Sequence, residues 1–151
     1  MKVRRGQALA LAVAAASGSL VFMAPPALAD GSLFGQTCCD PGGAKVTAYA
    51  NFISRYHVRV EDIKLTDLCP ADGHSVYVQF QYQQSSGDWV VRGDNRENHA
   101  SCDAGATSET PYDFTATSGR INAVRLKVCV DETWPNADDC QYTNYRYNQY
   151  D

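Results

Sequence analysis

The sequence predicts an all-β protein, a compact antiparallel β-sandwich of about six to eight strands stapled by three disulfides. Apolar and polar residues alternate through 75–84 (SVYVQFQYQQ) and through 121–132 (INAVRLKVCVDE), which is the period-two pattern of half-buried strands. Few segments after residue 29 combine helical spacing of apolar residues with capping residues. The six cysteines fit a small domain that stabilises a limited core with disulfides outside the reducing cytosol.

Four further segments favour strands: 44–54, 57–65, 88–95 and 140–150. Clusters of turn-forming residues lie at 85–87, 93–95 and 117–119 and are expected to separate strands. The apolar parity shifts between Val60 and Ile63, and a β-bulge at Glu61 and Asp62 would explain the shift. The long polar segment 98–120 is interpreted as a surface loop tethered by Cys102.

Residues 1–29 have the pattern of a secretory signal peptide. A basic start is followed by an apolar run from about residue 9 to 23, and small residues at Ala27 and Ala29 mark a cleavage site. The run is shorter than the ~20 residues of a membrane span and ends at a Pro-Pro pair. Cleavage after Ala29 would leave a secreted, extracellular protein that begins at Asp30 and has no membrane segment. The Arg4-Arg5 pair leaves open whether export follows the general secretory or the twin-arginine route.

Removal of residues 1–29 leaves 122 residues, which is one domain, and takes away three cations and no acid, so the formal charge changes from −4 to −7. An acidic domain has no long-range attraction for phosphate backbones or anionic lipid. Nucleic acid is therefore not an expected partner.

All six cysteines follow the signal and are expected to form three disulfides: Cys38, Cys39, Cys69, Cys102, Cys129 and Cys140. A bond between the adjacent Cys38 and Cys39 would be strained, which leaves about twelve of the 15 pairings. We favour Cys129–Cys140, with Cys38 and Cys39 bonding Cys69 and Cys102 in an order that stays open. A redox switch through a vicinal Cys38–Cys39 disulfide is the alternative.

No catalytic motif is present, and the protein is not expected to be an enzyme. His57, His74 and His99 are scattered, and a nucleophile elbow, H-E-x-x-H, a P-loop and C-x-x-C are all missing from the sequence. We expect no cofactor and no metal. Four acidic residues could offer oxygen ligands to Ca²⁺, and these are Asp131, Glu132, Asp138 and Asp139. The favoured interpretation is that they form a solvated hairpin end.

Tyrosines are concentrated at the end of the chain, where Tyr142, Tyr145, Tyr147 and Tyr150 lie beside amide side chains. Tyr with amides can stack on sugars or anchor a protein interface. Tyr is also favoured in strands for structural reasons alone, and this is the preferred interpretation. If the strand lies at an edge, it could accept a partner's strand.

After cleavage, residues 30–43 are expected to form an N-terminal arm with vicinal cysteines, followed by the sandwich domain at 44–151. Gly31 and Gly35 would make the arm flexible, and free ends usually fray. The two cysteines would anchor its base, so that Leu33 and Phe34 could insert into a groove of another protein. Packing of Leu33 and Phe34 on the protein's own core is the open alternative.

An exported, acidic, disulfide-bonded β-domain with a short apolar arm directly after its signal resembles the small adaptor subunit of the umbrella toxin particles that filamentous actinobacteria secrete. In that family the adaptor links a large, repeat-containing toxin subunit to lectin-like subunits, and its N-terminal segment inserts into a cleft of the lectin-like partner. The particle inhibits competing bacteria. By location, the resemblance implies that the partner-binding residues here are Asp30, Gly31, Ser32, Leu33, Phe34, Gly35 and Gln36.

Two functions are therefore expected. The first is a secreted, non-enzymatic protein-interaction module, with an adaptor role in an antibacterial toxin complex implied by the resemblance. The alternative is a stand-alone secreted carbohydrate-binding module or an inhibitor of an extracellular hydrolase.

Overall fold

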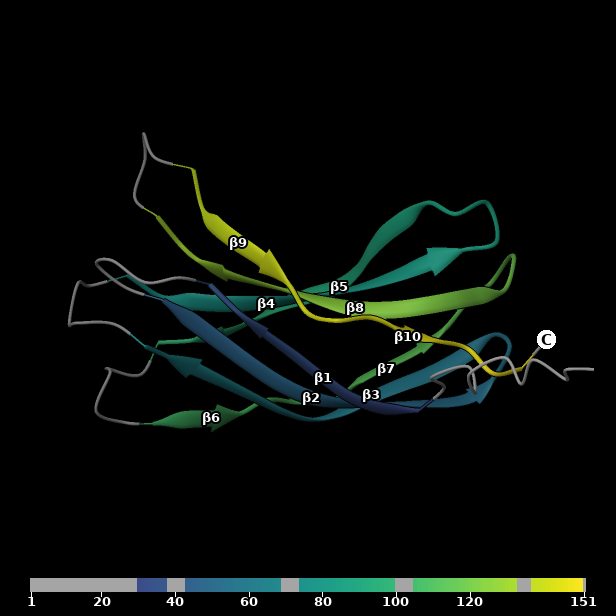
Figure 1. Cartoon of the computed structure of the whole chain (residues 1–151), viewed down its shortest axis with the longest axis horizontal. Coiled ribbons are helices and arrows are strands. Elements are labelled where there is room, and N and C mark those ends of the chain that lie inside the picture. The colour runs from purple at the N-terminus through teal and green to yellow at the C-terminus, as the bar shows by residue number, and fades with distance from the viewer. Residues whose placement is uncertain (1–29, 38–42, 69–73, 100–104, 133–136, 151) are drawn as a thin grey trace, which may run out of the picture.

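Two antiparallel sheets face each other across an apolar core (Figure 1). The computed structural model describes residues 30–37, 43–68, 74–99, 105–132 and 137–150. Within those ranges it contains strands and no helix, and so no helix that could cross a membrane. The all-β architecture of two antiparallel sheets confirms the coarser part of the predicted fold class. The described residues form ten strands rather than six to eight, because several are short, and the signal peptide and four of the six cysteines lie outside the described residues.

The first sheet has the order β1-β2-β3, and both β6 and β7 pair with β3. The second sheet has the order β10-β8-β4-β5, and β9 also pairs with β8. The strand bounds are β1 Gly31–Gln36, β2 Ala44–Ser54, β3 His57–Asp67, β4 Val76–Gln84, β5 Trp89–Asn98, β6 Ala106–Ser108, β7 Tyr112–Thr115, β8 Ile121–Val130, β9 Asp139–Tyr142 and β10 Arg146–Tyr147.

The core is built from the alternating apolar residues that the sequence indicates. The inward side chains of β8 lie directly beside those of the paired strand β4, and Phe80 lies near the rings of Tyr82, Tyr112 and Phe114. The largest side chains less than 2% exposed are Phe52, Phe80, Leu33, Ile63, Leu65, Ile121, Leu126, Val46, Val58, Val60, Val76 and Val78. Burial of such side chains is the main favourable term in folding, at roughly 25 cal/mol per Å² of apolar area.

The bulge predicted on β3 is confirmed. Thr47 lies opposite Lys64 and Tyr49 lies opposite Glu61, so β3 has one more residue than β2 between these pairs. Asp62 is the one described non-glycine residue with a positive φ, at 53°. The extra residue lets Val60 and Ile63 both point into the core despite their broken alternation.

The free N-terminal arm is not observed, because residues 31–36 form β1 and pair with β2 along their whole length. Leu33 is 1% exposed and belongs to the core, whereas its neighbour Phe34 is 51% exposed. Leu33 therefore packs on the protein's own core, which was the alternative to insertion into a partner. We expected a boundary between an arm at 30–43 and a sandwich that begins at residue 44. Residues 31–36 instead belong to the same sheet as β2.

Two other expectations about loops were wrong. Segment 98–120 contains β6 and β7, both paired with β3. The cluster at 93–95 is not a turn between strands; it lies inside β5, where Arg92 and Arg96 oppose Phe80 and Val78 with a shift of register. Gly93 has a φ of 77°, a conformation that favours glycine, so these turn-forming residues produce a bulge. The expected strand at 140–150 is divided into β9 and β10.

Candidate functional site

Both sheets expose aromatic side chains on their outer faces, and these two surfaces contain the candidate binding residues. The first surface, called the β1 surface, is formed by Ser32, Phe34, Thr47, Tyr49, Asp62 and Lys64. The second, called the aromatic face, lies on the second sheet and is formed by Gln81, Trp89, Arg125, Lys127, Tyr142, Tyr145 and Tyr147.

The β1 surface follows from the alternation of β1. Ser32, Phe34 and Gln36 point outward because Leu33 points into the core, and neighbouring side chains on a strand face opposite sides. The register places Phe34 beside Thr47 and Ser32 beside Tyr49. These residues border a hollow of about 460 Å³, with Leu33 and Ala48 beneath it and Asp62 and Lys64 on its far side.

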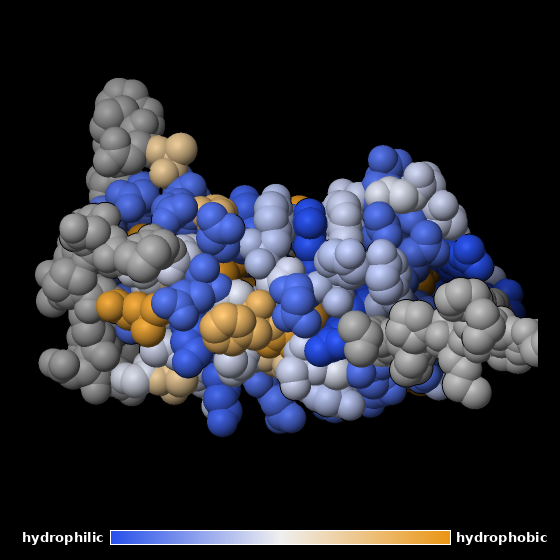
Figure 2. Space-filling view, in the orientation of Figure 1, coloured by the Kyte–Doolittle hydropathy of each residue, from blue (hydrophilic) through white to orange (hydrophobic). Residues whose placement is uncertain are grey.

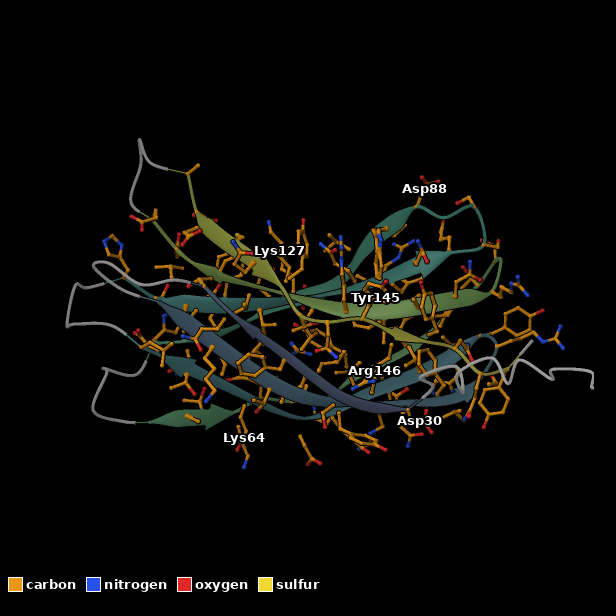
Figure 3. The ribbon with its side chains drawn as sticks, in the orientation of Figure 1. Asp30, Lys64, Asp88, Lys127, Tyr145 and Arg146 are labelled. Atoms are coloured by element: carbon orange, nitrogen blue, oxygen red, sulfur yellow. A yellow bond between two sulfur atoms is a disulfide. The ribbon has the colours of Figure 1, made fainter. Side chains whose placement is uncertain are left out.

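Charged side chains lie near the exposed ring of Phe34 and on the far side of the hollow that it borders. The ammonium of Lys45 lies 6.0 Å from the centre of the ring. Figure 2, which looks onto the edge of the sandwich where β1 lies in front, shows apolar side chains near the middle of the view with hydrophilic ones around them. Figure 3 shows Lys64 projecting outward from the first sheet. The arrangement resembles the apolar centre and polar rim of a protein interface.

The outer edge of β1 is held by residues 143–146, which follow β9 and include the first residue of β10. Asn144 and Arg146 bind the backbone of β1: Asn144 Nδ2 donates to the Ser32 carbonyl at 3.0 Å, and Arg146 Nη2 donates to the same oxygen at 2.8 Å. At Gly35 a Cβ would come within 3.1 Å of the Thr143 backbone nitrogen, so a side chain there would push the segment away. This contact closes one side of the sandwich and covers an edge that would otherwise invite strand addition.

The predicted N-terminal binding residues are therefore divided between two roles. Leu33 and Gly35 are buried, and Asp30 Oδ1 accepts a hydrogen bond from the Phe52 N–H at 2.7 Å. Ser32, Phe34 and Gln36 remain exposed at the surface. Binding through Asp30–Gln36 stays a prediction, but the side chains accessible to a partner are those of alternate residues.

The aromatic face is built by pairing of the five strands of the second sheet. Gln81 on β4 lies opposite Arg125 on β8, and Gln83 lies opposite Trp89 on β5. Tyr142 on β9 lies opposite Lys127. Tyr145 and Tyr147 contact each other edge to face at 5.1 Å between ring centres, and Tyr145 lies 6.4 Å from Trp89.

Arg125 lies at the centre of this face. Its guanidinium carbon is 4.0 Å from the centre of the Trp89 ring and 3.8 Å from that of Tyr142, so it packs against both rings. Its Nε donates to Gln81 Oε1 at 2.9 Å. Burial lowers the pKa of the Arg125 guanidinium, and the nearby Tyr142 opposes this effect. The sequence pointed to the tyrosines as candidate binding residues but not to Trp89 and Arg125. The alternation of Gln79, Gln81 and Gln83 with apolar residues was the local sign of an outward polar face on β4, the strand that pairs with both of them.

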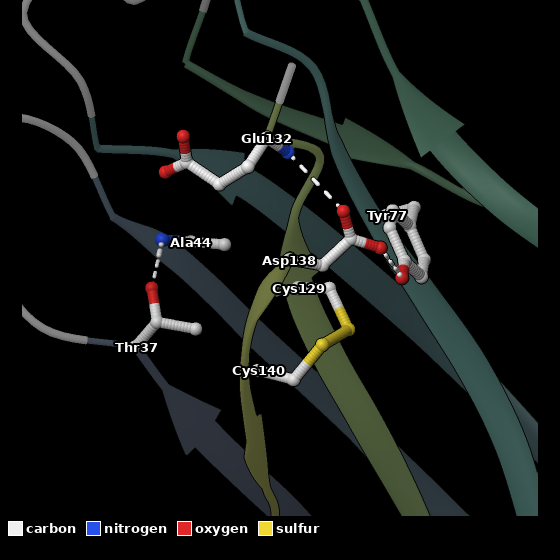
Figure 4. The surroundings of a disulfide bond; sticks show 7 residues. All are labelled: Thr37, Ala44, Tyr77, Cys129, Glu132, Asp138 and Cys140. Atoms are coloured by element: carbon white, nitrogen blue, oxygen red, sulfur yellow. Dashed lines mark hydrogen bonds between the residues drawn. A yellow bond between two sulfur atoms is a disulfide. The ribbon is translucent and has the colours of Figure 1, made fainter. Parts of the chain in front are cut away.

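The Cys129–Cys140 disulfide is confirmed, and it joins directly paired residues of β8 and β9. Figure 4 shows its surroundings. Close by, the Tyr77 hydroxyl donates to Asp138 at 2.6 Å, and the Glu132 N–H donates to the same carboxylate at 3.2 Å. Burial, together with the hydrogen bond to Asp138, raises the pKa of Tyr77. Pairings of the other four cysteines fall outside the described residues.

The histidines are not brought together. His57 Nε2 lies 2.6 Å from Asp113, His99 Nε2 lies 3.0 Å from Glu97, and His74 Nδ1 lies 3.0 Å from the Asp131 carbonyl oxygen. In the described part of the chain, no group of three or more His, Cys, Asp or Glu side chains is placed to hold a metal ion.

Comparison with family models, with curated proteins and with solved structures found no match to this chain. The resemblance to umbrella toxin adaptors therefore stays a prediction.

Proposed function

We propose that this chain is a secreted, non-enzymatic protein-interaction module that binds its partner through the β1 surface. The observation that carries the proposal is the exposed ring of Phe34 beside the hollow that ends at Asp62 and Lys64. A large aromatic side chain exposed among charges is the usual composition of a binding hot spot with its rim.

Rigidity supports this proposal. β1 is paired with β2 on one side and bound by Asn144 and Arg146 on the other, and Leu33 fixes it to the core. Phe34 is therefore displayed on a fixed strand, so little conformational entropy is lost when a partner binds. Because Asn144 and Arg146 already bind the β1 backbone, the partner is expected to recognise side chains rather than to add a strand.

An adaptor must bind two partners at once. The β1 surface and the aromatic face lie on different sheets, each on the side that points away from the core. Simultaneous binding at both is sterically compatible with this arrangement. This supports the adaptor role that the resemblance implies, in which one partner is lectin-like and the other is a large, repeat-containing toxin subunit.

Affinity purification of the native exported protein tests the proposal. We expect larger exported proteins to be recovered with it, and Phe34→Ala or Lys64→Glu to abolish their recovery. Ile53→Ala is the matched control, because Ile53 is 47% exposed on the same sheet but does not line the hollow. Recovery of a monomer alone under mild conditions, or equal loss with the control variant, would count against the proposal.

A second candidate function, carbohydrate binding, is favoured by the aromatic face. Tyr145 and Tyr147 are each almost half exposed, and the outward side chains of Gln79, Gln81 and Gln83 lie on β4 of the same sheet, with Gln83 opposite Trp89. Flat rings beside hydrogen-bonding amides suit a ligand with an apolar ring face and hydroxyl groups at its edge. Binding of a glycan array by the wild type and loss of binding in Tyr145→Ala would support this candidate.

A further inference from the structure

We propose that the aromatic face binds an acidic oligosaccharide, in which carboxylate groups on the sugar rings are held by Arg125 and Lys127. This inference rests on the second candidate function and specifies its ligand class. It is independent of protein binding at the β1 surface.

The guanidinium of Arg125 is positioned to bind a ligand by its edge. The rings of Trp89 and Tyr142 both pack against its guanidinium carbon, with their centres 4.0 and 3.8 Å away, and its Nε–H is engaged by Gln81. Within the described residues, Arg125 forms no ion pair and no further hydrogen bond. The remaining N–H groups are the ones that form paired hydrogen bonds with a carboxylate.

Lys127 adds a second cation on the same face, two residues along β8. It lies opposite Gln79 on one side and Tyr142 on the other. No described carboxylate lies within ion-pair distance of Lys127, whereas Arg59 on the first sheet is paired with Glu61 at 3.1 Å. Figure 3 shows Lys127 and Tyr145 on the second sheet. Two cations with no acidic partner among the described residues form a local positive site in a chain whose overall charge is negative.

The energetic state of Arg125 also favours an anion. Partial burial disfavours its charged form, because water is removed and no protein carboxylate replaces it. A ligand carboxylate would supply the missing counter-charge in a partly water-excluded position, where such an interaction is stronger than at a fully exposed site. The site is therefore better matched to an acidic ligand than to a neutral one.

The surroundings of the rings favour a sugar over an acidic protein segment. The groups beside the rings include the amide of Gln83 opposite Trp89 and the ammonium of Lys127 opposite Tyr142, together with the apolar side chains of Val91 and Ala123. Hydrogen-bonding groups therefore lie among the rings of this face. A protein hot spot is usually surrounded by contacts that exclude water. A polar oligosaccharide instead needs hydrogen-bond partners along its length and an aromatic surface under each ring face.

Binding of oligogalacturonate, compared with its fully methyl-esterified form, tests the proposal by calorimetry. The two probes share one sugar backbone and differ in charge. We expect the acid to bind roughly tenfold or more tightly than the ester, which is the effect of one charge-assisted hydrogen bond, and high salt to weaken the acid selectively. Lys127→Gln and Arg125→Gln should remove this preference. Lys64→Gln, on the other sheet, is the control that should retain it.

Three outcomes would overturn the proposal, and they differ in what they say about carbohydrate binding. Equal binding of acid and ester would leave a carbohydrate-binding function without acid specificity. No binding of either probe, together with a blank glycan array, would remove the carbohydrate candidate as well. Binding of poly-glutamate as tight as that of oligogalacturonate would mean that the site recognises charge on a polypeptide. Lys127→Gln keeps the Trp89–Arg125–Tyr142 stack, so its result does not depend on whether Arg125→Gln folds.

Discussion

Asn144 and Phe34 are joined by two reciprocal hydrogen bonds. The Phe34 N–H donates to Asn144 Oδ1 at 2.7 Å, and the Asn144 N–H donates to the Phe34 carbonyl at 3.2 Å. The two residues are 110 positions apart in the chain. The pair connects the edge strand of the first sheet to the segment between two strands of the second, so the ends of the domain stabilise each other.

Asn144→Ala should therefore lower the free energy of unfolding by about 1–2 kcal/mol, because the side-chain hydrogen bonds to Phe34 N–H and to the Ser32 carbonyl are lost. Chemical denaturation measures the change. Asn95→Ala is the control, since Asn95 is exposed on β5 and forms no such bonds in the described structure; its effect should stay within about 0.5 kcal/mol. Equal effects of the two variants would show that the contact does not hold β1.

Leu33→Ala should cost about 2–5 kcal/mol, because it leaves a cavity in the core. The neighbouring Phe34→Ala should change stability by no more than about 0.5 kcal/mol, since its ring is exposed. Urea titration of the two variants distinguishes a structural strand from a free arm. If Leu33→Ala unfolds at the same urea concentration as the wild type, β1 is not part of the folded domain in solution.

Replacement of Cys129 and Cys140 by alanine should lower stability by about 2–3 kcal/mol, since the bond closes a short loop with a sequence separation of 11. The Tm of the double variant is the measurement. Thiol counting of the double variant and the wild type under denaturing conditions checks that the replacement leaves the number of free thiols unchanged. An unchanged Tm would contradict a stabilising role for this bond.

Tyr112 should make stability depend on alkaline pH. Burial raises the pKa of Tyr112 from 10.0 to about 12, although Arg96 partly opposes this. The folded state therefore holds the phenol proton more tightly than the unfolded chain does, and this stabilisation is present below about pH 10 and lost as pH rises towards 12. Tyr112→Phe also loses the hydrogen bonds to the Val78 and Asp94 carbonyls, which costs about 1–3 kcal/mol at neutral pH.

Denaturation of wild type and Tyr112→Phe across the alkaline range tests this expectation. The difference in free energy of unfolding between them should shrink as pH rises from about 10 to 12. Tyr77, whose pKa is also raised, is present in both proteins and cancels in the comparison. A constant difference would mean that Tyr112 ionises alike in the folded and unfolded states.

Structural features whose pattern lies within one strand or one short connection could be predicted from the sequence. Strand β2 has the predicted bounds, and the bulge beside Asp62 was visible as a break in alternation. The Cys129–Cys140 bond could also be predicted, because both cysteines flank one short connection. These features depend on residues that are near each other in the chain.

Features that depend on distant residues could not be predicted. Gly31 and Gly35 suggested flexibility, but Gly35 is required because Thr143 approaches β1 closely, and nothing local indicates that contact. Similarly, the sequence showed an excess of tyrosine at the end of the chain but not the strand register that places Arg125 between Trp89 and Tyr142. The candidate site depends on the order of strands in the second sheet.

The disulfide between Cys129 and Cys140 links the geometry of the aromatic face to the redox state of the compartment in which the protein folds. It fixes β9 to β8 and so sets Tyr142 against Arg125 and Lys127. Protein made in a reducing compartment would lack this tie, while most of the core, which lies on other strands, could still assemble. If the aromatic face binds a ligand as proposed, oxidation of these two cysteines would add a covalent maturation step to the hydrogen bonds that already pair β9 with β8.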